Sequence, residues 1–122
     1  MRRKILVVED DADLAELLCF NLKQAGFTAR TVGDGAVALK QARSSLPDLI
    51  VLDLMLPELD GFAVCEMLRH DPATAKIPIL ILTAVSSQLA RLAGFEAGAN
   101  EFMTKPFVLR DLMARIQALA GS

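Results

Sequence analysis

Three things that this 122-residue sequence lacks narrow the class of protein it encodes. It has only two cysteines, Cys19 and Cys65, each inside an apolar helical pattern, so neither a structural disulfide nor a cysteine-based metal site is expected. No apolar run reaches the roughly 18 residues that a membrane span needs. Met1 is followed by charged residues rather than by a secretory signal. We therefore expect a protein without a membrane span, located in the cytoplasm.

The sequence also lacks an excess of positive charge. Its 13 Lys and Arg residues are set against 15 Asp and Glu residues, which gives a formal net charge of −2. Nucleic-acid binding depends on clustered positive charge, so we expect no direct nucleic-acid binding by this domain. Apolar residues make up 53% of the chain and charged residues 23%, which favours one folded domain over residues 1–122.

Short apolar runs alternate with segments of helical period along the whole chain. Continuous apolar runs are typical of strands buried on both faces. We expect five strands, at residues 5–8, 28–32, 49–52, 77–82 and 101–103. A helix is expected after each strand, with N-cap candidates at Asp10 or Asp11, Asp34, Asp60, and Ser86 or Ser87. This alternation predicts an α/β fold with a parallel sheet covered by helices on both faces.

Reactive side chains follow four of the five expected strands. The carboxyl ends of parallel strands meet at one edge of a sheet, and this edge is where open α/β folds place their sites. The residues expected there are Glu9, Asp10 and Asp11 after the first strand, Asp53 after the third, Thr83 and Ala84 after the fourth, and Thr104, Lys105 and Pro106 after the fifth.

The acids at this edge indicate a magnesium site. Carboxylates held close together repel one another, and a divalent cation with oxygen ligands relieves that repulsion. Asp10 and Asp53 are candidates for direct ligands, and Glu9 is a candidate either directly or through water. A backbone carbonyl just past Asp53, at Met55, is the candidate for the remaining protein ligand.

The same edge is suited to phosphoryl transfer. A carboxylate can attack phosphorus to give an aspartyl phosphate, and Asp53 is the candidate nucleophile. Lys105 can offer positive charge to the phosphoryl oxygens, and the Thr83 hydroxyl and Ala84 N–H can offer hydrogen bonds. Each residue alone has an ordinary alternative, such as helix capping or a surface charge. Their occurrence together at four strand ends favours phosphoryl acceptance.

Six motifs occur in order along the whole chain. They are ILVVEDD at 5–11, DLIVLDLMLP at 48–57, DG at 60–61, LTA at 82–84, GA at 98–99 and TKPF at 104–107. In this order and spacing the chain resembles the response-regulator receiver domains of two-component signal transduction, the CheY-like superfamily. It shows some resemblance to the receivers of winged-helix transcriptional regulators.

The resemblance implies a five-stranded, doubly wound, flavodoxin-like sheet of strand order 2-1-3-4-5. It implies phosphorylation of Asp53 by a sensor histidine kinase or a histidine phosphotransfer protein. It also implies Mg²⁺ held by Glu9, Asp10, Asp53 and the Met55 carbonyl. The chain would then be a switch that controls an output partner or domain, and not a turnover enzyme.

The resemblance further assigns the residues that respond to the phosphoryl group. It implies that Lys105 pairs with that group, that the Lys105–Pro106 bond is cis, and that Thr83 is the switch hydroxyl. Phe102 stands at the position of a moving aromatic that is frequently tyrosine. Phenylalanine lacks the phenol's outward hydrogen bond, so we expect the two states to be less sharply separated. Plain core packing of Phe102 is the alternative.

Two apolar residues occupy the positions that tune loss of the phosphoryl group in this family. Met55 lies two residues after Asp53, and Val85 lies two residues after Thr83. Neither side chain can orient an attacking water, so we expect slow autodephosphorylation.

The resemblance also suggests an interaction surface. A homodimer through the fourth helix, fifth strand and fifth helix is one expectation, and a solvated charged face is the alternative. Candidate charges there are Arg91, Glu96, Glu101, Asp111 and Arg115. No output domain is expected within these 122 residues, which leaves open a stand-alone receiver or a part of a longer regulator.

Three other functions fit the sequence less well. An aspartate-nucleophile phosphohydrolase usually carries a second aspartate where this chain has Met55. A degenerate receiver would usually have lost an acid or the lysine. A flavodoxin-like cofactor binder would need a phosphate-binding loop after the first strand, where this chain has acids that repel phosphate.

Overall fold

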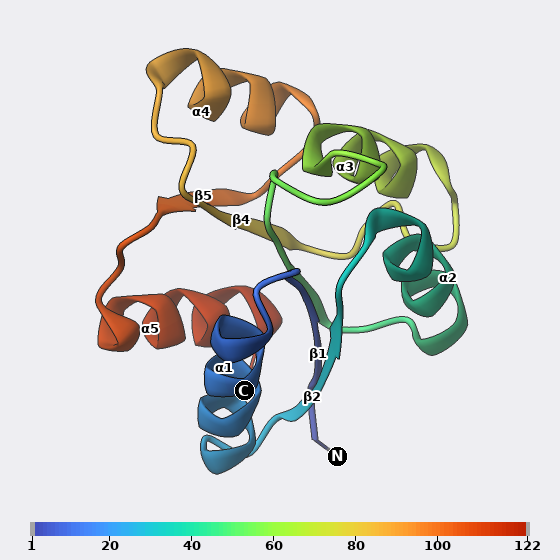
Figure 1. The fold of residues 1–122 in the computed structure, drawn as a ribbon. Coiled ribbons are helices and arrows are strands. Elements are labelled where there is room, and N and C mark those ends of the chain that lie inside the picture. Colours follow the sequence, from blue (N-terminus) through green and yellow to red (C-terminus); the bar gives the residue numbers. More distant parts are fainter. Residues whose placement is uncertain (1, 122) are drawn as a thin grey trace.

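The computed structural model describes residues 2–121, which form strands and helices in strict alternation (Figure 1). The elements are β1 (Lys4–Val8), α1 (Ala12–Gln24), β2 (Thr28–Val32), α2 (Gly35–Ser45), β3 (Leu49–Leu52), α3 (Gly61–His70), β4 (Ile79–Thr83), α4 (Gln88–Glu96), β5 (Glu101–Thr104) and α5 (Leu109–Ala120).

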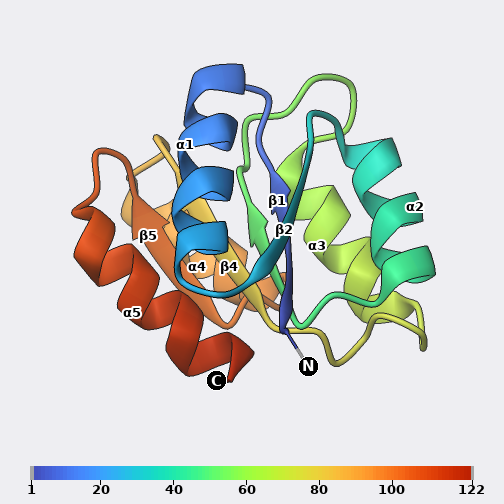
Figure 2. The same cartoon turned by 90° about the horizontal axis from the view of Figure 1, so that it is seen from below.

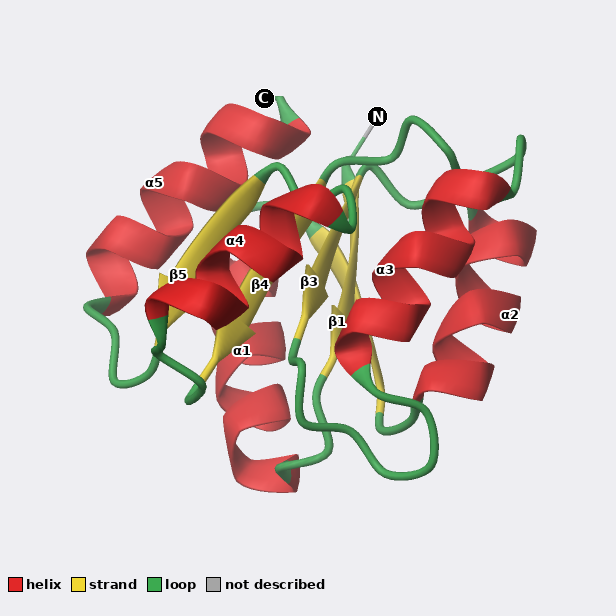
Figure 3. Ribbon diagram, turned by 90° about the horizontal axis from the view of Figure 1, so that it is seen from above, coloured by secondary structure: helices red, strands yellow, loops and turns green. Residues whose placement is uncertain are grey.

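The five strands form one parallel sheet in the order β2-β1-β3-β4-β5. Helices α1 and α5 cover one face of this sheet, and α2, α3 and α4 cover the other (Figures 2 and 3). The α/β doubly wound fold and its strand order, which the sequence and the family resemblance predicted, are confirmed.

β1, β3 and β4 form where they do because both of their faces are buried. All five residues of β4 and all four of β3 are buried, which explains their continuous apolar sequences. Alternate residues of a strand enter opposite cores, so that in β1 Val7 packs towards α1 and α5, while Val8 packs towards α2 and α3. Burial of each such side chain contributes about 1.5–3 kcal/mol, which fixes the register of the strands against their helices.

The helix starts resolve two alternatives that the sequence left open. The N-cap of α1 is Asp11, whose Oδ1 accepts hydrogen bonds from the N–H groups of Asp13 at 3.1 Å and Leu14 at 3.2 Å. The N-cap of α4 is Ser87, whose hydroxyl accepts from the Ala90 N–H at 3.1 Å. Because Asp11 caps the helix, the carboxylate of Asp10 is left for the sheet edge.

The predicted start of the fourth strand, at Ile77, is wrong by two residues. The Ile77 N–H donates to the Thr74 carbonyl in a turn, and Pro78 has no N–H to donate. β4 begins at Ile79, whose N–H donates to the side-chain oxygen of Asn100 at 2.9 Å. The strand also continues one residue further than predicted, so that Thr83 is its last residue.

None of the helices within residues 2–121 is long and apolar enough to cross a membrane.

Candidate functional site

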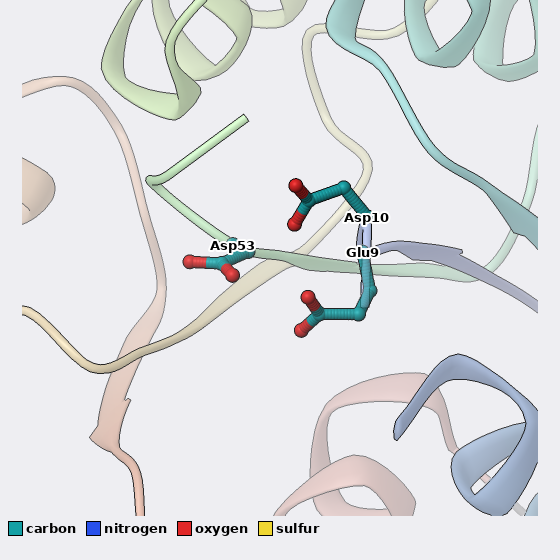
Figure 4. Close-up of side chains that lie close together, drawn as sticks. All are labelled: Glu9, Asp10 and Asp53. Carbon is teal, nitrogen blue, oxygen red and sulfur yellow. The ribbon is translucent and has the colours of Figure 1, made fainter. Parts of the chain in front are cut away.

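Three carboxylates meet at the carboxyl edge of the sheet. Glu9 and Asp10 directly follow β1, and Asp53 directly follows β3, the neighbouring strand, in which Leu52 pairs with Val8. One carboxylate oxygen from each acid lies within 4.8 Å of the others, and the three side chains lie close together at this edge (Figure 4). Glu9 and Asp53 are each only 5% exposed, whereas Asp10 is open to solvent. The structure therefore brings together the three acids that the sequence predicted.

Lys105, which follows β5, reaches into this cluster. Its Nζ lies 2.7 Å from Oε1 of Glu9 and 3.0 Å from Oδ2 of Asp53. Its backbone N–H donates to the Thr83 carbonyl at 2.8 Å, which fixes the start of the loop that carries it. The pairing with Glu9 joins residues 96 positions apart, and no local sequence signal predicts it.

Burial and hydrogen bonding act in opposite directions on the pKa values of Glu9 and Lys105, which are hydrogen-bonded to each other. Burial raises the pKa of Glu9 above its ordinary value, against the opposing hydrogen bonds from Lys105 and from the Asp11 N–H. For Lys105, burial alone would lower the pKa, but the hydrogen bonds to Glu9 and Asp53 outweigh it, and the pKa is raised. The ammonium of Lys105 is therefore stabilised in its charged form by the two carboxylates.

A tight turn fixes the carboxylate of Asp53. The Met55 N–H donates to Oδ1 of Asp53 at 3.1 Å, while Oδ2 faces Lys105. The first residue of α3, Gly61, packs directly on this turn and donates its N–H to the Leu54 carbonyl at 2.9 Å. A Cβ on Gly61 would lie 2.5 Å from the Leu54 Cα and closer still to the Asp53 carbonyl oxygen. The DG motif at 60–61 thus supports the turn that carries Asp53, a role that the sequence did not reveal.

The hydroxyl and amide predicted for this edge lie at the end of β4. Thr83 is fully buried and pairs in register with Thr104, and its hydroxyl accepts from the Val85 N–H at 3.3 Å. Ala84, the next residue, is exposed at the sheet edge. Because Leu52 of β3 pairs with Ile81 of β4, Thr83 and Ala84 end on the same side of the sheet as Asp53.

The remaining predicted residues lie on or just after β5. Phe102 is 2% exposed and pairs in register with Ile81, so its ring is packed into the core beneath α4. The Lys105–Pro106 peptide bond is cis, as the family resemblance implies.

The charges and ligand atoms of the cluster fit a divalent cation with oxygen ligands. Three carboxylates and one ammonium leave a formal charge of −2 when all are ionised, and this charge is confined to a partly buried space. Carboxylate oxygens are the ligands that Mg²⁺ prefers. The residues present therefore match a magnesium site in both charge and chemistry.

Comparison with known proteins gives a consistent result. The family model described as "Response regulator receiver domain" matches residues 5–117. The chain is 46% identical over 119 residues to the alkaline phosphatase synthesis transcriptional regulatory protein PhoP of Bacillus subtilis, covering 98% of this chain and 49% of PhoP. It is 43% identical over 116 residues to the DNA-binding dual master transcriptional regulator RpaA of Synechocystis, covering 95% of this chain and 48% of RpaA.

Solved structures agree with the sequence relatives. The non-phosphorylated HemR receiver domain from Leptospira biflexa superposes with a TM-score of 0.90 at 36% identity, covering 99% of this chain and 96% of that one. The receiver domain of sensor histidine kinase PA1611 from Pseudomonas aeruginosa, with a magnesium ion coordinated in its active site cleft, has a TM-score of 0.90 at 31% identity and full coverage of both chains.

The chain spans about half the length of the curated relatives it matches. The match itself covers nearly the whole of this chain. It includes β2 to β5 and all of β1 except Lys4, and it contains the strand-end acids and the lysine. The chain belongs to the response regulator receiver domain family.

Proposed function

We propose that this domain is a signalling switch that accepts a phosphoryl group on Asp53 from a sensor histidine kinase or a histidine phosphotransfer protein. The observation that carries the proposal is the position of the Asp53 carboxylate. It is 5% exposed, it is held by the Met55 N–H on one oxygen and by Lys105 on the other, and it lies within the cluster of Glu9 and Asp10.

The transfer step follows from this arrangement. A carboxylate oxygen of Asp53 forms a bond to phosphorus as the bond from phosphorus to the donor imidazole nitrogen breaks, and the imidazole keeps the electron pair and takes up a proton. Lys105 lies where it can offer positive charge to the phosphoryl oxygens. The Thr83 hydroxyl and the Ala84 N–H are the proposed hydrogen-bond donors to the same oxygens.

We assign the metal to Glu9, Asp10, Asp53 and the backbone carbonyl of Met55. A bound Mg²⁺ would neutralise the acids and the phosphoryl oxygens. Two acids of this set are nearly buried, so their mutual repulsion is weakly screened without a cation.

The phosphoryl group would act on the rest of the domain through Thr83 and Phe102. Thr83 ends β4, and Phe102 lies beside β4 on β5 and packs under α4. The Thr83 hydroxyl accepts a hydrogen bond from the Val85 N–H. Movement of this hydroxyl towards Asp53 would break that bond and so remove a restraint on the loop that leads to α4. Since Phe102 has no phenol hydroxyl, its alternative position is stabilised less than that of a tyrosine.

We also propose that the phosphoryl group is lost slowly. Met55 is 60% exposed beside the acceptor, and Val85 is half-buried after Thr83. Both side chains are apolar, so neither can orient an attacking water. Met55→Asn should accelerate decay of the phosphorylated protein, as followed by intact mass after removal of the phosphodonor. Rapid decay in the wild type, unaffected by substitution of either residue, would contradict this proposal.

A homodimer through α4, β5 and α5 is the proposed route to an output. In the monomer Arg115 of α5 pairs with Glu101 of β5 at 2.8 Å, so part of the charge of this surface is already neutralised within the chain. Leu89 and Leu92 of α4 are 79% and 53% exposed and supply an apolar strip beside it.

Regulation of DNA binding by an attached output domain is proposed from the relatives, which are named as DNA-binding and transcriptional regulators.

The test is incubation with acetyl phosphate, with and without Mg²⁺, followed by intact mass. We expect a magnesium-dependent gain of one phosphoryl group that is absent in Asp53→Ala and retained in Asp13→Ala, an acidic residue in the first turn of α1. If the wild type neither gains a phosphoryl group nor binds beryllofluoride with Mg²⁺, the domain is an interaction module that works without phosphate.

A further inference from the structure

The ring of Phe102, on β5, is packed between residues of β4 and α4. It pairs in register with Ile81 of β4 and lies beneath Gly94 of α4. A Cβ on Gly94 would lie 3.0 Å from Cδ1 of Ile81 and 3.1 Å from Cδ2 of Phe102. Because residue 94 has no side chain, the backbone of α4 rests almost directly on the ring, so the position of α4 and the position of the ring depend on each other.

Arg91, one turn earlier on α4, contacts Phe102 in two ways. Its guanidinium carbon lies 5.8 Å from the centre of the Phe102 ring, which is within the range of a cation–π interaction. Its Nη1 also donates to the backbone carbonyl of Phe102 at 3.3 Å. The guanidinium therefore touches both the ring and the main chain of the same residue.

The guanidinium of Arg91 is further held by Phe95, whose ring centre lies 5.5 Å away. Within residues 2–121 no carboxylate forms an ion pair with Arg91, whereas the nearby Arg115 pairs with Glu101. The interaction of Arg91 with the two rings and the carbonyl is thus not in competition with an acid of the described chain.

We infer that Arg91 is the positioning residue for Phe102, holding its ring buried and fastening α4 to β5, so that the ring cannot leave its place without release of Arg91. The inference deepens the proposed function and rests on it where it concerns switching. A tyrosine at position 102 could make a hydrogen bond of its own in an outward position. Phe102 has no such hydroxyl. Its buried position is instead favoured over the outward one by the contact with the guanidinium of Arg91.

Release of Arg91 would change the surface formed by α4 and β5. Arg91 is already exposed, so its release would move the guanidinium over the surface of α4 and β5 and uncover more of the ring of Phe95, which is 38% exposed in the structure. A change at Phe102 would in this way alter the charge and the apolar area that a partner meets.

Fluorine NMR of the whole domain labelled with 4-fluorophenylalanine tests the inference. The chain has six phenylalanines, and Phe102→Leu identifies the resonance of residue 102. A soluble paramagnetic reagent then measures the exposure of each ring. An exposed cation–π contact contributes about 0.5–1 kcal/mol. Its loss in Arg91→Gln should therefore raise the population with Phe102 exposed about two- to fivefold.

The controls separate positioning from general stability. Arg110→Gln removes the same charge from an exposed site on α5 and should leave the Phe102 resonance unchanged. Arg91→Lys keeps the charge but not the planar fork, and should give an intermediate exposure. If Arg91→Gln lowers the unfolding temperature but leaves Phe102 as protected as in the wild type, Arg91 is only a structural contact and the inference is overturned.

A beryllofluoride titration in the presence of Mg²⁺ then tests the coupling to the site. The half-saturating concentration should change by about two- to fivefold in Arg91→Gln relative to Arg110→Gln. Equal values in the two variants would overturn the coupling. Failure of the wild type to bind beryllofluoride would instead count against the proposed function, and the exposure of Phe102, measured without that ligand, would still decide the role of Arg91.

Discussion

The ammonium of Lys105 lies 2.7 Å from the carboxylate of Glu9, closer than it lies to Asp53, the proposed acceptor. Lys105 therefore neutralises part of the charge that would attract a divalent cation. We expect Lys105→Ala to tighten Mg²⁺ binding about three- to tenfold, because two carboxylates lose a competing positive partner. The same change should weaken beryllofluoride binding, because the phosphoryl oxygens lose their cation.

Calorimetric titration with Mg²⁺ alone, and then with beryllofluoride added, separates these two effects of opposite sign. Lys40→Ala, on the exposed side of α2, removes an equal charge far from the cluster and should change neither affinity. If Lys105→Ala weakens Mg²⁺ binding, the lysine organises the carboxylates rather than competing for them.

Gly61 should be required for metal binding although it offers no ligand. A methyl group at this position would clash with the backbone of Asp53 and Leu54 and displace the turn that carries the Asp53 carboxylate. We expect Gly61→Ala to weaken Mg²⁺ binding at least about tenfold and to destabilise the fold by about 1–3 kcal/mol through overpacking.

The matched control is Gly33→Ala, since nothing lies within 4 Å of a Cβ at Gly33. That variant should keep the Mg²⁺ affinity of the wild type. To separate loss of fold from loss of geometry, the magnesium titration is made at a temperature at which circular dichroism shows Gly61→Ala to be folded. Wild-type affinity in the folded variant would show that the turn tolerates displacement.

Glu58 is strained in the loop between β3 and α3. Its φ of 70° lies in the left-handed region, and its side chain is exposed. Glu58→Gly should raise the free energy of unfolding by about 0.5–1 kcal/mol, because relief of strain outweighs the added freedom of the unfolded chain. Gly26→Ala, at a φ of 97° in open space, should lower it by a similar amount. Urea unfolding measures both, and a destabilised Glu58→Gly would show that the glutamate side chain has a stabilising contact.

Strand positions were predictable where burial alone decides them. The run at 49–52 matches β3 residue for residue, because a continuous apolar run directly reports burial on both faces. The predicted strand at 28–32 also matches β2, although Ala29 is its only buried residue. The start of β4 was not predictable in this way. It depends on the Asn100 side chain, which lies 21 positions away and accepts the Ile79 N–H.

The candidate site, too, was predictable only in part from the sequence. Glu9, Asp10 and Asp53 were predictable as neighbours, since each follows a strand and the carboxyl ends of parallel strands share an edge. The contact between Lys105 and Glu9, and that between Arg91 and Phe102, depend on side-chain conformations across different elements. Sequence position constrains where such groups lie, but not which of several acceptors a long side chain selects.

The two cysteines should differ sharply in reactivity. Burial raises the pKa of the Cys65 thiol to about 11, and Cys65 is fully buried, whereas Cys19 is half-buried on α1. At pH 8 only about 0.1% of Cys65 is thiolate, the reactive form, and that fraction is shielded. With N-ethylmaleimide, peptide mass mapping should show Cys19 modified first and Cys65 modified only as the domain unfolds in urea. Cys19→Ala should then leave the native protein almost unlabelled. Rapid native labelling of Cys65 in that variant would mean that α3 opens far more readily than its packing against β3 and β4 implies.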